Sequence, residues 1–226
     1  RELVEHPAAA AAAFTGSLAG GKALAALAAA RPVPIPFHAE MGSLNPLFIL
    51  PGALRKRGPE IASGYVRAFT LFAGQMCTKP GVLAAPDGPD LDAFLAVAAS
   101  EVRKTPPVAM LNPDVRDNFE ASVAALSESA PAWAESEAPV DPRGNESACR
   151  LFVTEAARFR ATPLLRAESF GPASLVLRAR DAEDLLALAE SSEGSLTATL
   201  HAEPEDDTLV DSLLPLLEGK AGRVLW

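Results

Sequence analysis

The chain has 226 residues, 49% of them hydrophobic and 22% charged, and a formal net charge of −9. This composition supports a folded core and excludes a chain that is disordered over most of its length. The acidic balance argues against proteins that bind nucleic acid or anionic membranes, because both need clustered Lys and Arg. No apolar run approaches the roughly 18 residues of a membrane span, and no signal peptide is visible.

The two cysteines, Cys77 and Cys149, lie far apart and have no CxxC or Cys/His spacing. This pattern disfavours a disulfide framework and a zinc site, and we expect no bound metal. A reducing cytoplasm is the expected location.

Apolar periodicity predicts the secondary structure in chain order. A short apolar run before Gly16 is followed by a helix at 17–30, and the prolines at 32, 34 and 36 lead into an extended segment. Further strands are predicted at 46–50, 82–85, 151–153, 174–177, 196–200 and 223–226, and further helices at about 58–72, about 90–103, about 113–128, 182–190 and 206–217. Residues 129–145 are predicted to be a loop. Alternating strands and helices indicate an α/β fold with a largely parallel sheet.

A glycine-rich turn at 16–22 lies between the first predicted strand and helix. Backbone N–H groups at the start of a helix form an anion site. The spacing matches most of GxxxxGK[ST], but Ala23 stands where a Ser or Thr hydroxyl would hold Mg²⁺, and no apolar strand ends in an Asp for the second metal position. A kinase or ATPase loop is therefore disfavoured. Two interpretations remain at this point, a pyrophosphate-binding turn and simple helix capping by Ser17.

Two residues have the chemistry of a nucleophile and a base. Cys77 occupies a turn bounded by Gly and Pro between a predicted helix and strand, where a thiol can be exposed and aimed. Glu40 follows an extended apolar segment, and burial there would favour a role as general base. Each has a plainer interpretation, because most lone cysteines pack in the core and most glutamates are solvated.

Taken in order, four segments resemble motifs of the aldehyde dehydrogenase superfamily. FTGS at 14–17 with Gly21 resembles the FTGSxxxG cofactor turn, and EMGSLNP at 40–46 resembles the ELGGKNP glutamate motif. GQMC at 74–77 resembles the GQxC nucleophile motif, and ESFGP at 168–172 resembles ExFGP. Residues 43–44 are Ser-Leu, where the family usually has Gly-Lys. Together with the CTKPG sequence at 77–81, which begins with the cysteine, this pattern is most similar to the branch that oxidises α-ketoglutaric semialdehyde.

The resemblance implies NAD- or NADP-dependent oxidation of a small-molecule aldehyde through a cysteine thiohemiacetal and thioester. It implies roles for seven residues: Cys77 as nucleophile, Glu40 as general base, Gly16, Ser17 and Gly21 at the cofactor pyrophosphate, Glu168 at the nicotinamide ribose and Phe170 beside the nicotinamide. It also implies a homo-oligomer. We expect Glu40 and Cys77 to share a cleft at the carboxyl ends of the parallel strands, where α/β folds place ligands.

The resemblance also implies a domain division. Residues 1–37 would be the last strand–helix unit of a nucleotide-binding domain, and residues 38–226 a catalytic domain truncated at both ends relative to the family. We expect such a fragment to self-associate and to show little dehydrogenase activity alone.

Two other classes of function stay open. One is an inactive fragment that keeps the fold as an assembly module. The other is a cysteine hydrolase that pairs Cys77 with His38 or His201. The remaining candidates have plainer interpretations: Cys149 is predicted to be structural, and His6, His38 and His201 to be surface or packing residues.

Overall fold

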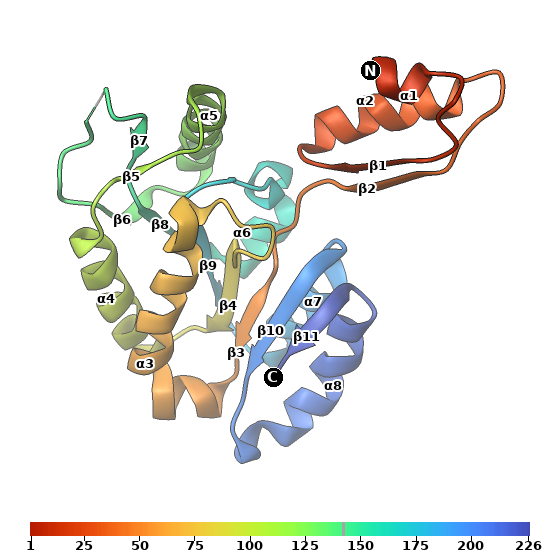
Figure 1. Ribbon diagram of the computed structural model, residues 1–226. Coiled ribbons are helices and arrows are strands. Elements are labelled where there is room, and N and C mark those ends of the chain that lie inside the picture. Colours follow the sequence, from red (N-terminus) through yellow and green to blue (C-terminus); the bar gives the residue numbers. More distant parts are fainter. Residues whose placement is uncertain (142) are drawn as a thin grey trace. The chain divides into compact units, whose positions relative to one another are not determined.

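The computed structural model describes residues 1–141 and 143–226 (Figure 1). The chain forms two compact units, Arg1–Gly42 and Ser43–Trp226, which we describe separately. Over the described residues, no helix combines the length and apolarity that crossing a membrane requires.

The first unit is a two-stranded parallel ribbon with two helices, α1 (Glu2–Glu5), β1 (Ala12–Thr15), α2 (Leu18–Ala29) and β2 (Phe37–Glu40). The predicted helix and extended segment are both present. Phe37 pairs with Ala12 and Glu40 with Thr15, so the strand that carries the EMGSLNP glutamate belongs with this unit. The unit therefore ends after Gly42, five residues beyond the boundary predicted from the sequence. Its origin as part of a nucleotide-binding domain stays a prediction.

The second unit is built on a seven-stranded sheet with the order β11-β10-β3-β4-β9-β8-β6. All neighbours are parallel except β6 and β8, which are antiparallel. The strands are β3 (Leu47–Ile49), β4 (Val82–Pro86), β6 (Ala132–Glu135), β8 (Arg150–Glu155), β9 (Ala173–Ala179), β10 (Ser195–His201) and β11 (Ala221–Leu225). A separate antiparallel pair joins β5 (Val108–Ala109) and β7 (Glu146–Ser147). The predicted α/β fold with a largely parallel sheet is confirmed.

Helices cover both faces of this sheet, as Figure 1 shows. The helices α3 (Pro51–Thr70) and α4 (Pro89–Lys104) pack on one face. The other face is covered by α5 (Pro113–Ser129), α6 (Ala156–Ala161), α7 (Ala182–Ser191) and α8 (Asp207–Glu218). Side chains alternate between the two cores: Leu47 and Ile49 face α3 and α4, whereas Phe48 faces the other layer. This alternation explains why the strands read as continuous apolar runs.

Helix α3 begins at Pro51, seven residues before the predicted start at about 58. Strand β3 ends just before the Pro51-Gly52 pair, and helix α3 begins at that pair rather than after it. Proline is well suited to the first position of a helix, where its missing N–H costs nothing. The Asp206 carboxylate also accepts hydrogen bonds from the N–H groups of Gly52 and Ala53, at 2.9 and 3.3 Å. This cap comes from a residue about 150 positions away and has no local signal.

The prediction of a loop at 129–145 is wrong in its first part, because β6 lies there and pairs with β8. A four-residue segment, Ala-Trp-Ala-Glu, is too short to show periodicity, and the pairing partner makes it a strand. Position 142 of the predicted loop lies outside the described residues.

Candidate functional site

The glycine-rich turn lies at the start of α2. The Gly16 N–H donates to the Glu40 carbonyl at 3.1 Å, so the turn is held against the end of β2. The Ser17 hydroxyl oxygen accepts from the Gly20 N–H at 3.2 Å and caps the helix. A side chain at Gly21 would overlap the Met41 sulfur. The capping interpretation is thus realised, and the binding of a pyrophosphate by Gly16, Ser17 and Gly21 stays a prediction.

Glu40 is the last residue of β2, where its side chain is half-buried. Its backbone is fixed by pairing with Thr15 and by the Gly16 hydrogen bond. Glu40 belongs to the first unit and Cys77 to the second, and their pairing as base and nucleophile stays a prediction.

Cys77 is exposed and follows an unusual backbone turn. Three consecutive residues, Phe72, Ala73 and Gly74, have left-handed φ values of 50°, 57° and 64°. Such a run is costly for residues with a Cβ and persists only where the surroundings impose it. The chain then closes a second turn, in which the Lys79 N–H donates to the Met76 carbonyl at 3.0 Å.

Asn45 is buried and holds the Cys77 turn from inside. Its Nδ2 donates to the carbonyls of Cys77 and Lys79, at 2.8 and 2.9 Å. Its Oδ1 accepts from the Ser43 hydroxyl at 2.7 Å and from the Thr197 N–H at 3.0 Å. One amide side chain therefore ties the Cys77 turn to the segment before β3 and to β10.

The segment that carries Glu168 and Phe170 meets the same turn. Lys79 is buried, and its ammonium donates to the carbonyls of Ser169 and Ala173, at 2.7 and 2.9 Å. Gly74 lies so close to the Gly171 carbonyl that no side chain fits between them. Glu168 is half-buried, and the Phe170 ring is exposed. The structure thus brings Cys77, Glu168 and Phe170 into one region of the second unit.

This region lies at the amino ends of the strands. The Cys77 turn immediately precedes β4, and the segment with Glu168 and Phe170 immediately precedes β9. The expectation of a site at the carboxyl ends is therefore wrong for Cys77. The general tendency of α/β folds does not apply here, because the loops that enter β4 and β9 carry the candidate residues.

The same observation removes one of the alternative pairings. His201 ends β10 at the opposite, carboxyl edge of the sheet, and β10 is parallel to β3 and β4. His201 and Cys77 therefore lie at opposite ends of the parallel strands. A cysteine hydrolase built on these two side chains is contradicted.

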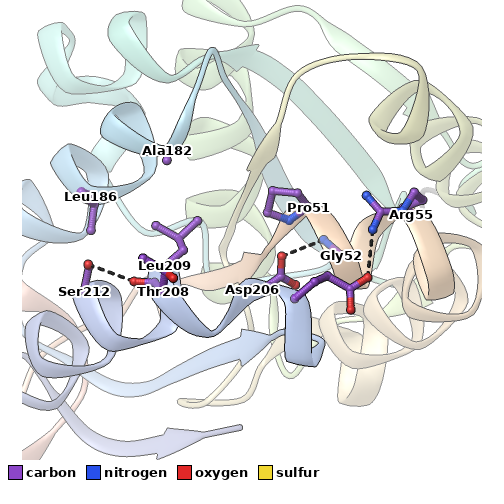
Figure 2. A pocket seen from close by; sticks show the side chains of 10 residues that line it. Pro51, Gly52, Arg55, Ala182, Leu186, Asp206, Thr208, Leu209 and Ser212 are labelled. Atoms are coloured by element: carbon purple, nitrogen blue, oxygen red, sulfur yellow. Dashed lines mark hydrogen bonds and ion pairs between the residues drawn. The ribbon is translucent and has the colours of Figure 1, made fainter.

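A pocket of about 560 Å³ does lie at the carboxyl edge (Figure 2). It is lined by the starts of α3, α7 and α8. Its carboxylates are satisfied within the protein: Asp206 accepts from backbone N–H groups at the start of α3, and Glu205 accepts from Arg55 at 2.9 Å. These contacts join α3 to the turn before α8, so we interpret this pocket as a structural junction.

Comparison with known proteins decides the family. The family model described as "Aldehyde dehydrogenase family" matches residues 1–209. The chain belongs to the aldehyde dehydrogenase family. This confirms the resemblance drawn from the four motifs.

Two relatives of this aldehyde dehydrogenase chain carry related names. The chain is 44% identical over 223 residues to alpha-ketoglutaric semialdehyde dehydrogenase 2 of Azospirillum brasilense, covering 99% of the chain and 42% of the relative. It is 39% identical over 227 residues to alpha-ketoglutaric semialdehyde dehydrogenase of Acinetobacter baylyi, covering 99% and 43%. The chain thus spans less than half the length of these relatives.

Solved structures show the same fold. Apo betaine aldehyde dehydrogenase of Staphylococcus aureus superposes with a TM-score of 0.82 at 18% identity, covering 99% of the chain and 45% of that structure. Gamma-glutamyl-gamma-aminobutyraldehyde dehydrogenase of Burkholderia cenocepacia gives 0.79 at 21% identity, with the same two coverages.

Two residues that build this candidate site were not singled out from the sequence. Asn45 follows the glutamate in its motif, and its Asn-Pro dipeptide indicates only a turn. Lys79 lies in a turn bounded by Pro and Gly, where a lysine is normally solvated. Their roles depend on partners more than 30 positions away, as with Cys77 for Asn45 and Ser169 for Lys79.

The two thiols of the aldehyde dehydrogenase chain should react at very different rates. Cys149 is fully buried, and burial raises its pKa to about 12, whereas Cys77 is exposed. Because the thiolate is the reactive species, limiting iodoacetamide should label Cys77 first. Peptide mapping by mass spectrometry measures the order, and denatured protein, in which both thiols react, is the control. Preferential labelling of Cys149 in folded protein would contradict the assignment.

Proposed function

We propose that this protein carries the catalytic cysteine of an NAD(P)-dependent dehydrogenase that oxidises α-ketoglutaric semialdehyde to a carboxylate. The observation that carries the proposal is the exposed Cys77 thiol on a backbone turn fixed by Asn45 and Lys79, beside the segment with Glu168 and Phe170. Family membership supports the reaction class, and the names of the two relatives support the substrate.

Each unit, taken by itself, carries residues with the chemistry that a dinucleotide cofactor needs. The start of α2 presents backbone N–H groups of the kind that bind a pyrophosphate, and a side chain at Gly16 or Gly21 would overlap Phe14 or Met41. Phe170 offers an exposed aromatic ring for the nicotinamide, and Glu168 a carboxylate for ribose hydroxyls. When bound, NAD(P)⁺ accepts a hydride, that is, a proton with two electrons. The choice between NAD and NADP is decided by contacts to the adenosine ribose.

Each protein group then has a chemical task. The Cys77 thiolate attacks the aldehyde carbon and forms the C–S bond of a thiohemiacetal. The oxygen of the thiohemiacetal can accept a hydrogen bond from the Cys77 backbone N–H. Loss of hydride from that carbon leaves a thioester on Cys77. Glu40 takes a proton from water as the water attacks the thioester, so that carboxylate is released and the thiol is regenerated.

Variants of the longest polypeptide that the gene encodes would test these roles. In Cys77→Ser, formation of NAD(P)H from the semialdehyde should fall to background. In Glu40→Gln, a first burst of NAD(P)H should persist, whereas steady turnover falls by about 10²–10⁴-fold, the usual contribution of a general base. Cys149→Ser, which changes the buried thiol, is the matched control and should keep the cysteine chemistry.

Two outcomes would favour another class. Stoichiometric acylation of Cys77 without formation of NAD(P)H would favour a hydrolase. If neither acylation nor NAD(P)H formation is seen, an assembly module is favoured. Turnover that survives Cys77→Ser would contradict the proposal.

The same samples test the proposed homo-oligomer. Strand β11 lies at the edge of the sheet; its last residue, Leu225, is 47% exposed, and Trp226, which follows it, is 74% exposed. An unpaired edge with apolar side chains favours self-association. Sedimentation at micromolar protein should give a mass of at least two chains, and a clean monomer would contradict it.

A further inference from the structure

Lys79 is a buried cation with an unusual set of partners. Its residue is 2% exposed, and the ammonium donates to two backbone carbonyls, those of Ser169 and Ala173. Burial lowers its pKa to about 8, while Glu168 opposes this effect. A buried lysine is rarely retained unless its charge is compensated by close partners.

The two carbonyls bracket the segment that carries Phe170. Ser169 lies before Phe170, and Ala173 is the first residue of β9. Between them the chain has no side chain at Gly171, and the Phe119 ring occupies the space that a Cβ would need. The segment therefore depends on bonds to its backbone, and Lys79 supplies two of them.

Lys79 reaches this segment from the nucleophile turn. Lys79 lies two residues after Cys77. Asn45 fixes this turn independently, because its Nδ2 donates to the carbonyls of Cys77 and Lys79. Removal of the Lys79 ammonium would thus leave the Cys77 turn held by Asn45 and release the 168–173 segment.

We propose that Lys79 is a positioning residue that fixes the 168–173 segment against the Cys77 turn and so sets where the cofactor lies relative to the thiol. The inference rests on the proposed function for the roles of Cys77, Glu168 and Phe170. It adds a residue whose ammonium acts through the backbone carbonyls of Ser169 and Ala173.

Hydrogen exchange followed by mass spectrometry tests the contact without any activity. In Lys79→Met, two carbonyls lose a charged donor, and exchange in peptides covering 168–173 should rise by about tenfold or more. Peptides from β3 and β10 should be unchanged. A matched control is Lys220→Met, because Lys220 also donates to two carbonyls, those of Glu190 and Ser192. Its effect should be confined to residues 190–195 and 220. Unchanged exchange at 168–173 in Lys79→Met would overturn the proposal.

A wild-type measurement covers the case in which Lys79→Met does not fold. Limited acetylation with acetic anhydride should modify Lys79 more slowly than Lys22, Lys56 and Lys104, which are exposed. Acetylation of Lys79 at the rate of the exposed lysines would also overturn the proposal.

Kinetics separate positioning from general stability. In the longest encoded polypeptide, Lys79→Met should raise KM for NAD(P) by about tenfold. Acetylation of Cys77 by 4-nitrophenyl acetate should stay within about threefold of wild type, because Asn45 still holds the turn. Equal losses in both would indicate a merely structural role and overturn the proposal. If wild-type Cys77 is not acetylated, the proposed function fails, while the exchange result still decides the Lys79 contact.

Discussion

Gly74→Ala should destabilise the protein by about 3–5 kcal/mol, because a Cβ adds left-handed strain and overlaps a backbone carbonyl. Gly74 has φ 64°, and the overlap is with Gly171, which no rotamer change can relieve. The Cys77 turn and the 168–173 segment would have to move apart. Urea unfolding followed by circular dichroism measures the loss of free energy of unfolding.

Gly64→Ala is the matched control. Gly64 lies inside α3, and no neighbouring atom occupies the space of its Cβ. Alanine there should stabilise the protein by about 0.5–1 kcal/mol, because glycine loses more backbone entropy in a helix. A loss in Gly74→Ala below about 1 kcal/mol would show that the backbones do not approach closely.

Asn45→Ala should cost about 3–5 kcal/mol, since it leaves several buried polar groups without their partners. The carbonyls of Cys77 and Lys79 lose their donor, and the Thr197 N–H loses its acceptor. The Cys77 turn should then become mobile. The midpoint of urea unfolding and the amide exchange rates of residues 76–79 both report the change.

Asn112→Ala provides the comparison for an asparagine whose amide makes one local bond. Asn112 caps α5 by accepting from the Val115 N–H at 2.9 Å, near the surface. Loss of such a cap costs about 1 kcal/mol. If Asn45→Ala cost no more than Asn112→Ala, the central role of Asn45 in the site would be contradicted.

The sequence by itself determined the fold class and the family. Apolar runs such as 46–50 and 174–177 are buried strands because a parallel sheet covered on both faces needs apolar residues at every position. The four motifs resembled the aldehyde dehydrogenase family because each is a short run of specific residues and all four occur in the order that the family has. These signals are local, so they can be recognised without coordinates.

Only the tertiary structure decided how the candidate site is held together and at which edge of the sheet it lies. Cys77 was expected at the carboxyl ends of the strands and lies at their amino ends, because the direction of each strand fixes where its loops emerge. The cap of α3 by Asp206 and the bonds of Asn45 to Cys77 and of Lys79 to Ser169 join residues 32 to 154 positions apart. Periodicity and turn residues describe neighbours along the chain, whereas these hydrogen bonds depend on distances that exist only after the sheet has formed.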